Sequence, residues 1–421
     1  MADCEMVTDP QQVRGNILLQ ELSELSTLNR TKENVGRLEI LLTDYLVCIV
    51  RASTESLLMQ SPLPDDGVLG RGAWLALQSN QGDRDDIDWL VGTHPGSVIW
   101  STLFSLGLVH EKARENFLSA ALAGYRTSAS VGNFLGVGHR SKWHVTGTAG
   151  TFAAASTASV SLGYPDAVHQ NALQLAGANF GGSALAPRER DGASGFNRSA
   201  ATTLGTTAAM AAIAGAVAVE NLWEGPLGIL TIFSASDFPS DAKLTVDGVS
   251  TTALRLFPVT GFAQSAVLAA ALLAQRNSGR LEELEIRVGE GALAWLDGSR
   301  GGFWWDVKAA VAAAWVSKDP TNLPPTNEYL DRVRVSGAQL PFGAASVSIR
   351  TSSGHDGETI SSPPGMDFND SREVQWRMAK WNAMVGDRFS EVAEVSKALI
   401  GGVSTPELWD RIEKLLRNQY N

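Results

Sequence analysis

Three things are scarce in this sequence of 421 residues, and each scarcity excludes a class of protein. Only two cysteines occur, Cys4 and Cys48, which excludes a disulfide framework and a cysteine-ligated iron–sulfur cluster. No block of Lys or Arg stands out and the net charge is -11, so nucleic acid and anionic membranes are not expected as partners. Apolar runs such as 208–219 are too short, and too rich in alanine, to be predicted as membrane spans.

The beginning of the chain also lacks a targeting signal. Its first residues, MADCEMVTDPQQ, are acidic and contain no apolar core of the kind a signal peptide needs. Together with the low cysteine content, this predicts a cytoplasmic protein. The hydrophobic content of 44% is ordinary for a globular protein with a large core, and the length suits two or three domains.

The stretch from Gly138 to Ser161, GHRSKWHVTGTAGTFAAASTASVS, combines a bulky basic and aromatic approach with a run of very small residues. Small side chains allow close approach of neighbouring backbones, so we expect a loop leading into a helix at the centre of a helical body. The start of this helix contains glycine and threonine, including Thr146 and Thr148. Free backbone N–H groups at such a start favour an anion, and His144 lies directly upstream.

The hydrophobic pattern predicts a mainly helical protein with a smaller α+β part. Apolar residues at helical spacing dominate as far as residue 250 and return near the end, whereas alternating segments occur between. We therefore expect a large helical domain over 1–250 and 387–421 and an α+β lid over 251–386. Helices are predicted over 10–28, 33–58, 73–78, from about 97, 166–178, 200–219, 260–276, 367–385 and 406–420. Strands are predicted over 281–288 and near 344, with the GETISS segment as a hairpin partner of the second.

An acidic segment precedes a loop histidine. Asp83, Asp85, Asp86 and Asp88 lie ahead of His94, and Pro95 disfavours helix at that histidine. A carboxylate beside an imidazole fixes its tautomer and raises its basicity, so these residues form a candidate acid–base group. The alternative is a solvated acidic loop in which Asp85 or Asp88 caps a helix. A second long irregular segment, 177–200, is rich in glycine and charge, which is typical of functional or disordered loops.

Several stretches spread along the chain resemble the MmgE/PrpD family, which includes 2-methylcitrate dehydratases, cis-aconitate decarboxylases and an iminodisuccinate epimerase. The resemblance rests on DDIDWLVGTHPGSV at Asp85, KWHVTGTAGTFAAA at Lys142, GFNRSAATTLGTTAAMAA and ENLWEGPLGILTIFS between Gly195 and Ser234, and RLFPVTGFAQSAVLAA at Arg255. A weaker match is REVQWRMAKWNAM at Arg372. It implies a large all-helical domain built from both termini, a smaller α+β lid, a homodimer, and a site in the cleft between the domains.

The resemblance also implies the chemistry. Members of the family abstract a proton next to a carboxylate without a metal or an organic cofactor, and then lose water, lose carbon dioxide or take the proton back. His94 and His144 match functional histidines of the family. Where the family has an acidic residue, this sequence has Arg84, with aspartates on both sides. Where the family has a threonine, this sequence has Asp88. The predicted catalytic residues are His144, His94, Asp88 and Asp86; His144 is the favoured base or acid, and His94 with the Asp85–Asp88 group supplies its partner.

Other family positions carry different residues here. Ser194 occupies the position of a catalytic lysine of the family, and Asn197 and Arg198 are close by in the sequence. Arg255 occupies the position of a second lysine, and Trp376 that of a tyrosine. Two lid histidines become Thr260 and Gln264. Arginine binds carboxylates through a bidentate fork but does not give up a proton, so Arg255 can bind substrate and cannot replace lysine as a proton carrier. The predicted substrate-binding residues are Arg84, Thr146, Thr148, Ser194, Asn197, Arg198, Arg255 and Trp376.

These substitutions indicate a pocket less suited to a citrate-like polyanion than to a larger, partly apolar acid. The leading hypothesis is a cofactor-independent lyase of the dehydratase type that moves a proton next to a carboxylate or carbonyl of a small organic acid. One alternative is an isomerase, epimerase or cyclase of a larger carboxylate-bearing metabolite. The other is an inactive relative that binds a ligand.

Overall fold

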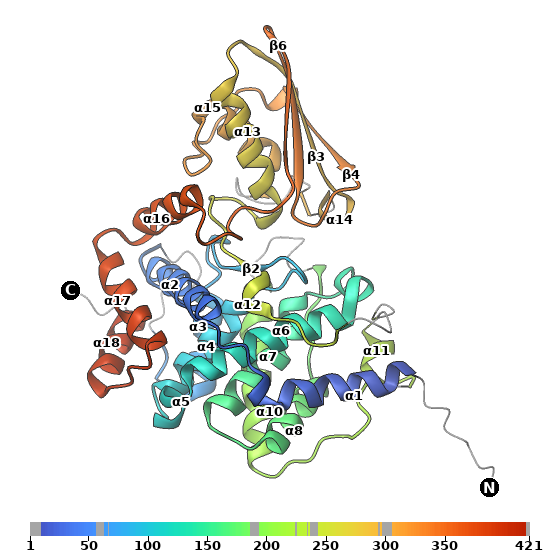
Figure 1. The fold of residues 1–421 in the computed structure, drawn as a ribbon, viewed down its shortest axis with the longest axis vertical. Helices are drawn as coiled ribbons and strands as arrows, with labels where there is room; N and C mark the ends of the chain where they lie inside the picture. Colours follow the sequence, from blue (N-terminus) through green and yellow to red (C-terminus); the bar gives the residue numbers. More distant parts are fainter. Residues whose placement is uncertain are drawn as a thin grey trace, which may run out of the picture.

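The computed structural model describes residues 10–55, 63–65, 67–185, 193–223, 225–233, 235, 243–293, 295–296 and 305–417; at 10–13, 53–55 and 193–194 it describes the backbone alone. Within these residues a large helical body carries a smaller part built on a β-sheet (Figure 1). The predicted fold class, mainly α with a smaller α+β part, is confirmed.

The helical body is made of elements from both ends of the chain. Its long helices enclose α7, which is buried along its whole length. Neighbouring helices α4, α6, α8 and α10 contact it on all sides, so the predicted central helix is confirmed. The elements of the body are α1 (Pro10–Ser23), α2 (Lys32–Glu55), α3 (Gly67–Gln78), α4 (Pro95–Gly107), α5 (Glu111–Glu115), α6 (Phe117–Arg140), α7 (Val145–Ser161), α8 (Asp166–Gly177), α10 (Ala193–Ile213), α11 (Ile229–Ile232), α12 (Gly248–Thr251), α17 (Phe389–Ile400) and α18 (Pro406–Arg417).

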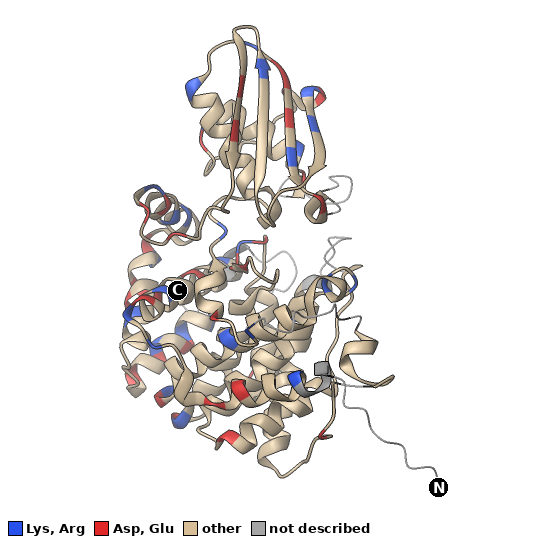
Figure 2. Ribbon diagram, turned by 45° about the vertical axis from the view of Figure 1, so that its right-hand side comes forward, with Lys and Arg blue, Asp and Glu red and all other residues tan. Residues whose placement is uncertain are grey.

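The smaller part is a four-stranded sheet with helices on one face (Figure 1). The strand order is β4 (Val333–Ala338), β3 (Leu281–Gly289), β5 (Ala345–Thr351) and β6 (Gly354–Ile360). β3 pairs with β4 in parallel and with β5 antiparallel. Alternate residues of β3 and β5 are buried against α13 (Gln264–Arg276) and α15 (Val307–Ser317), whereas charged residues occupy the other face (Figure 2).

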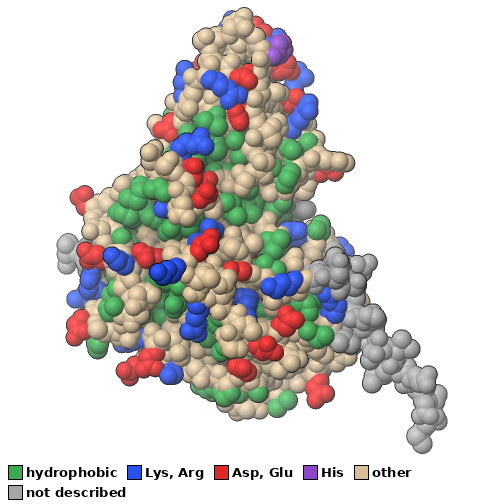
Figure 3. All heavy atoms as spheres, in the orientation of Figure 1, with side chains coloured by type: hydrophobic (Ala, Val, Ile, Leu, Met, Phe, Trp, Pro, Cys, Tyr) green, Lys and Arg blue, Asp and Glu red, His purple; other side chains and the backbone are tan. Residues whose placement is uncertain are grey.

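Two short segments join the parts. β1 (Ile87–Asp88), from the acidic loop, pairs antiparallel with β2 (Thr252–Ala253), where the chain passes into the smaller part. The other is α16 (Ser371–Val385), which contacts α2 of the helical body. Because of these contacts, we propose that the boundary of the smaller domain falls before Ser371 and not at residue 386. Hydrophobic side chains gather on the surface where the two parts meet (Figure 3).

The element predictions differ from the structure mainly at helix starts and short strands. The helix predicted over 200–219 begins at Ala193 and ends at Ile213, so part of the segment expected to be irregular is helical. β4, α15 and α17 were not predicted. The last residues of the helices predicted over 33–58 and 406–420 lie outside the described residues. In the described part of the chain, no helix combines the length and apolarity needed to cross a membrane.

Candidate active site

A cavity of about 320 Å³ lies where the helical body meets the sheet part, and both predicted histidines line it. The body contributes the acidic loop, the end of α6 and the start of α7, and the smaller part contributes the segment after β2 and α14 (Glu290–Leu293). Its walls are largely apolar and include five aromatic rings. The aromatic lining residues are Trp143, Phe262, Trp295, Trp305 and Phe342, and the polar or charged ones are Asp83, His94, Arg140, Ser141, His144, Arg255, Thr260 and Glu290.

His94 is held at the start of α4 with a defined tautomer. Its backbone N–H donates to Thr146 Oγ1 (3.1 Å), and its ring Nδ1 lies 2.6 Å from the carbonyl oxygen of Asp86. A carbonyl only accepts, and this contact is much shorter than the 3.5 Å between Nδ1 and the donor Arg255 Nη2, so Nδ1 carries the proton and Nε2 keeps its lone pair. Burial, followed by the charges of Arg198 and Arg255, holds the pKa of His94 well below its ordinary value. The neutral ring is therefore equipped to act as a base.

His144 has the opposite tautomer. It precedes α7, its backbone N–H donates to Gly182 O (2.8 Å), and Asn197 Nδ2 donates to its ring Nδ1 (3.1 Å). Because Nδ1 accepts, the proton of the neutral ring lies on Nε2. Burial, followed by the charges of Arg198 and His94, holds the pKa of His144 well below its ordinary value. The ring is thus a hydrogen-bond donor.

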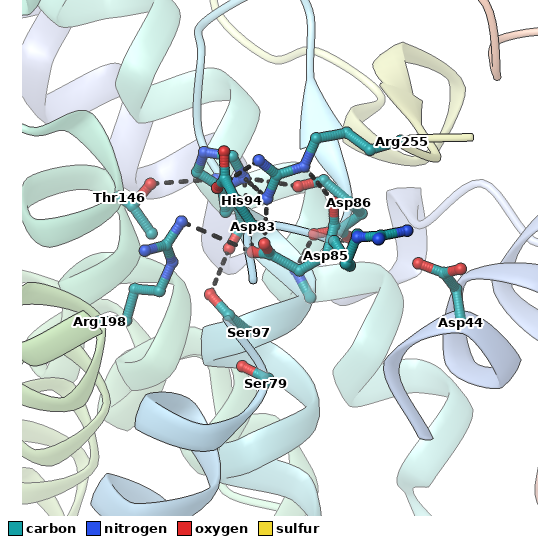
Figure 4. Close-up of polar contacts among 12 residues, drawn as sticks. Asp44, Ser79, Asp83, Asp85, Asp86, His94, Ser97, Thr146, Arg198 and Arg255 are labelled. Atoms are coloured by element: carbon teal, nitrogen blue, oxygen red, sulfur yellow. Dashed lines mark hydrogen bonds and ion pairs between the residues drawn. The ribbon is translucent and has the colours of Figure 1, made fainter. Parts of the chain in front are cut away.

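Arg255 is paired with the acidic loop (Figure 4). Its guanidinium forms ion pairs with Asp83 and Asp85, and its Nε donates to the backbone carbonyl of Asp85 (2.7 Å). Arg255 is 1% exposed, and these contacts connect residues 170 positions apart in the sequence. Two carboxylates already neutralise this cation, and its geometry fixes the loop. Arg255 also lines the cavity, so its role as a substrate clamp stays a prediction.

Arg198 lies behind the cavity wall. It is 2% exposed, and its Nη2 lies 3.6 Å from Asp85 Oδ2 (Figure 4). Among the described residues, its Nε and Nη1 have no hydrogen-bond partner. Arg198 does not line the cavity. It therefore acts on both histidines through its charge, which lowers their pKa values.

The carboxyl groups of Asp86 and Asp88 do not reach the cavity, which corrects their predicted catalytic role. Asp86 accepts from Gly96 N–H (3.0 Å) and from the Tyr125 hydroxyl (3.1 Å), so it caps α4 and supports His94 through its carbonyl. Burial raises the pKa of Asp86 to about 8. Asp88 accepts from Thr251 Oγ1 and Leu90 N–H, both at 2.8 Å, and fixes the turn after β1. A capping aspartate was expected, but at Asp85 or Asp88.

The start of α7 is covered by another backbone segment, which corrects the predicted anion site. A Cβ at Gly147 would lie 2.4 Å from the carbonyl oxygen of Gly181, so only glycine permits this approach. The N–H groups of Gly147 and Thr148 donate to His144 O. Thr146 receives the His94 N–H, and the hydroxyl of Thr148 donates to His139 Nε2 (2.8 Å). Both threonines are therefore structural.

Two further predicted binding residues, Arg84 and Trp376, do not line the cavity, and a third, Ser194, has a side chain outside the described structure. The Arg84 carbonyl accepts from Lys380 Nζ (2.8 Å), whereas its neighbour Asp83 is the residue that lines the cavity. Trp376 on α16 contacts the ring of Phe257 (5.3 Å between centroids); it is partly buried, packs against the hydrophobic core and does not line the cavity. Ser194 lies in the first turn of α10, and the surroundings of its side chain are outside the described structure.

The sequence interpretation missed Arg140, and it gave no role of its own to Asp83. Asp83 has a φ of 57°, a conformation that costs a non-glycine residue on the order of 1–3 kcal/mol and that is often kept at functional sites. Arg140 follows a break in α6 at Gly136 (φ 73°, ψ -168°), which redirects the last turn of the helix toward the cavity. The only signal for Arg140 was its place in the basic and aromatic stretch before His144.

In the described structure, no group of three or more His, Cys, Asp or Glu side chains is placed to hold a metal ion.

Two neutral histidines of opposite tautomer, in an aromatic cavity between a helical body and an α+β part, define a site for acid–base chemistry on a small molecule. The family comparison agrees. Residues 75–242, which contain both histidines, match the model of the MmgE/PrpD N-terminal domain. A match to this domain implies activity of the organic-acid lyase or dehydratase type. No curated protein sequence matches the chain.

Proposed function

We propose that this protein is a cofactor-independent lyase of the dehydratase type, in which His94 takes a proton from the carbon next to a carboxylate or carbonyl. The observation that carries the proposal is the pair of tautomers. His94 presents a lone pair on Nε2 because its Nδ1–H is bound by Asp86 O, and His144 presents an N–H because its Nδ1 accepts from Asn197. This refines the sequence prediction, which favoured His144 as base or acid.

The proposed steps balance with these two groups. The C–H bond breaks and its proton moves to His94 Nε2, while the His144 N–H hydrogen-bonds the substrate oxygen on which negative charge develops. The electron pair left on carbon forms a C=C bond as the C–O bond to a β-hydroxyl breaks. The His94 imidazolium returns its proton to that hydroxyl, and water leaves. Both histidines end in their starting state.

The charged groups around His94 suit this cycle. Asp85 Oδ2 lies 3.4 Å from His94 Nδ1 and stabilises the imidazolium once the proton has arrived. Arg255 and Arg198 oppose that charge, so the ring returns the proton readily. These opposing contacts favour a base that cycles between neutral and charged forms.

The test is incubation of the purified protein in deuterated buffer with cis-aconitate, 2-methylcitrate and extracts containing candidate acids, followed by mass spectrometry. We expect loss of water from at least one acid, with deuterium entering the recovered acid wherever the proton transfer to His94 reverses. His94→Gln should abolish it, and His144→Ala should slow it by about 100-fold or more, with thermal stability within about 1–2 kcal/mol of the wild type. His355→Gln, at an exposed histidine of β6, is the matched control.

The aromatic walls favour a second candidate, an isomerase or cyclase that folds a larger carboxylate-bearing substrate. Epimerisation shares the first proton transfer, so deuterium would enter recovered acid without loss of water. A purely shape-driven ring closure would show neither. Full activity of His94→Gln would remove His94 from every one of these mechanisms, and a ligand bound tightly but released unchanged would indicate a binding protein.

A further inference from the structure

Arg140 differs from the other cation of the cavity in its partners. Arg255 is paired with two carboxylates, whereas Arg140 forms no ion pair with any described residue. Its Nη1 donates to Leu90 O (3.1 Å), and its guanidinium carbon lies 5.3 Å from the centre of the Phe342 ring. Among the described cavity residues, Arg140 is therefore the one cation that has donors available for an anionic ligand.

When Arg140 is included, the formal charges in and behind the cavity cancel. The described lining residues include the anions Asp83 and Glu290 and the cations Arg140 and Arg255, and behind them Asp85 and Arg198 add one charge of each sign. Both histidines are neutral at pH 7. A tricarboxylate would bring three negative charges into a site with one available cation, and two of them would lack a partner.

The rest of the wall is apolar and already ordered. Phe262 stacks on Trp295 (5.7 Å between centroids) and meets the edge of Phe342 (5.5 Å), which in turn contacts Trp89 (5.6 Å). Phe342 also carries Arg140 on its face. Rings held by one another lose little freedom when a ligand arrives, so this surface suits an aromatic or other flat apolar group.

We infer that Arg140 is the carboxylate anchor of the site and that the ligand is an acid with a single carboxylate and an aromatic or broad apolar body. The guanidinium would hold the carboxylate in a bidentate contact at one end of the cavity, and the ring cluster of Phe262, Trp295 and Phe342 would receive the body. The inference rests on the proposed function for the identity of the site, but it concerns binding and can fail separately.

The test compares three probes by ligand-observed NMR titration: 3-phenylpropionate, its neutral amide 3-phenylpropionamide, and tricarballylate. We expect the wild type to bind 3-phenylpropionate at least about tenfold more tightly than either of the others, because a hydrogen-bonded charge contributes a factor of this order. Arg140→Met should abolish the preference for the acid over the amide and leave amide binding within about twofold.

Arg114→Met is the matched control. Arg114 also donates to a backbone carbonyl (Gly107 O, 2.6 Å) and lies over an aromatic ring (Trp409, 5.1 Å), but it belongs to α5, away from the cavity. It should leave all three affinities unchanged. The inference is overturned if the wild type does not bind 3-phenylpropionate, if tricarballylate binds more tightly, if Arg140→Met keeps the acid preference, or if that variant loses amide binding as well. Failure of turnover with this binding pattern intact would overturn only the proposed lyase.

Discussion

The two histidines of the cavity are distinguished by which ring nitrogen carries the proton, and a single amide decides this for His144. Asn197 donates to Nδ1, so the ring N–H points away from α10. In Asn197→Asp a carboxylate takes the place of the donor, accepts from Nδ1–H and favours the imidazolium. We therefore expect the pKa of His144, now well below its ordinary value, to rise. Since protonation would then occur at higher pH, the acid limb of activity should move to higher pH.

Nitrogen-15 NMR of the imidazole rings measures this without a substrate. In the wild type, His94 should show a protonated Nδ1 and His144 a protonated Nε2, both without titration near pH 6.5. In Asn197→Asp only His144 should change tautomer and begin to titrate. Asn171→Asp, at a half-buried amide of α8 that bonds the segment after α10, should change neither ring. A wild-type His144 already protonated at Nδ1 would reverse the proposed roles.

Residue identities alone located the histidines but not their partners. His94 and His144 were predicted from short motifs, and the structure brings both to one cavity. Which of four neighbouring aspartates faces that cavity depends on the left-handed conformation at Asp83, which composition does not reveal. Likewise, the sequence does not reveal that Arg255 is paired with carboxylates about 170 residues earlier in the chain.

At the scale of elements, α6 shows how a local break serves the site. Gly136 has φ 73° and ψ -168°, a conformation nearly restricted to glycine, and the turn that follows carries Val137 and Arg140 to the cavity. Gly136→Ala should cost about 1–3 kcal/mol of stability, or else straighten the helix and weaken 3-phenylpropionate binding. Denaturant unfolding and the same NMR titration check both outcomes.

The matched control is Gly36→Ala in α2. Gly36 is helical and has open space around its Cβ position, so this change should stabilise the protein by about 0.5–1 kcal/mol. Stability and binding equal to the wild type in Gly136→Ala would show that the break is not needed.

Helices and strands with a strong hydrophobic period along their whole length could be predicted from the sequence. The ends of elements whose residues are typical of loops could not. The alternating residues of β3 and the hairpin of β5 and β6 were expected and are confirmed. α10 begins seven residues earlier than predicted, because its first turns are rich in Gly, Ser and Asn, which favour turns in isolation. β4 is a short edge strand with half-exposed residues, so its six residues carry little pattern.

At the scale of the whole molecule, α16 connects α2 with the loop that carries Asp83 and Asp85. Lys380 Nζ donates to Asp44 Oδ1 (2.6 Å) and to Arg84 O (2.8 Å), and both charged side chains are almost fully buried. Asp44 also accepts from Trp381 Nε1 (2.7 Å). This buried ion pair therefore holds the acidic loop from behind, opposite the cavity.

Lys380→Met should lower both the stability of the fold and the activity of the site, and the two effects can be measured separately. It leaves the Asp44 carboxylate buried without its cation, which costs about 3–5 kcal/mol, whereas the double variant Asp44→Asn with Lys380→Met removes the lone charge and should recover much of that loss. Both variants lose the bond to Arg84 O, so both should lose solvent deuterium exchange. For comparison, Arg411→Met, which breaks the exposed pair with Glu394, should cost less than about 1 kcal/mol and leave exchange intact. Full exchange in the stable double variant would show that Lys380 supports the fold alone, and exchange lost despite recovered stability would show that it positions the acidic loop.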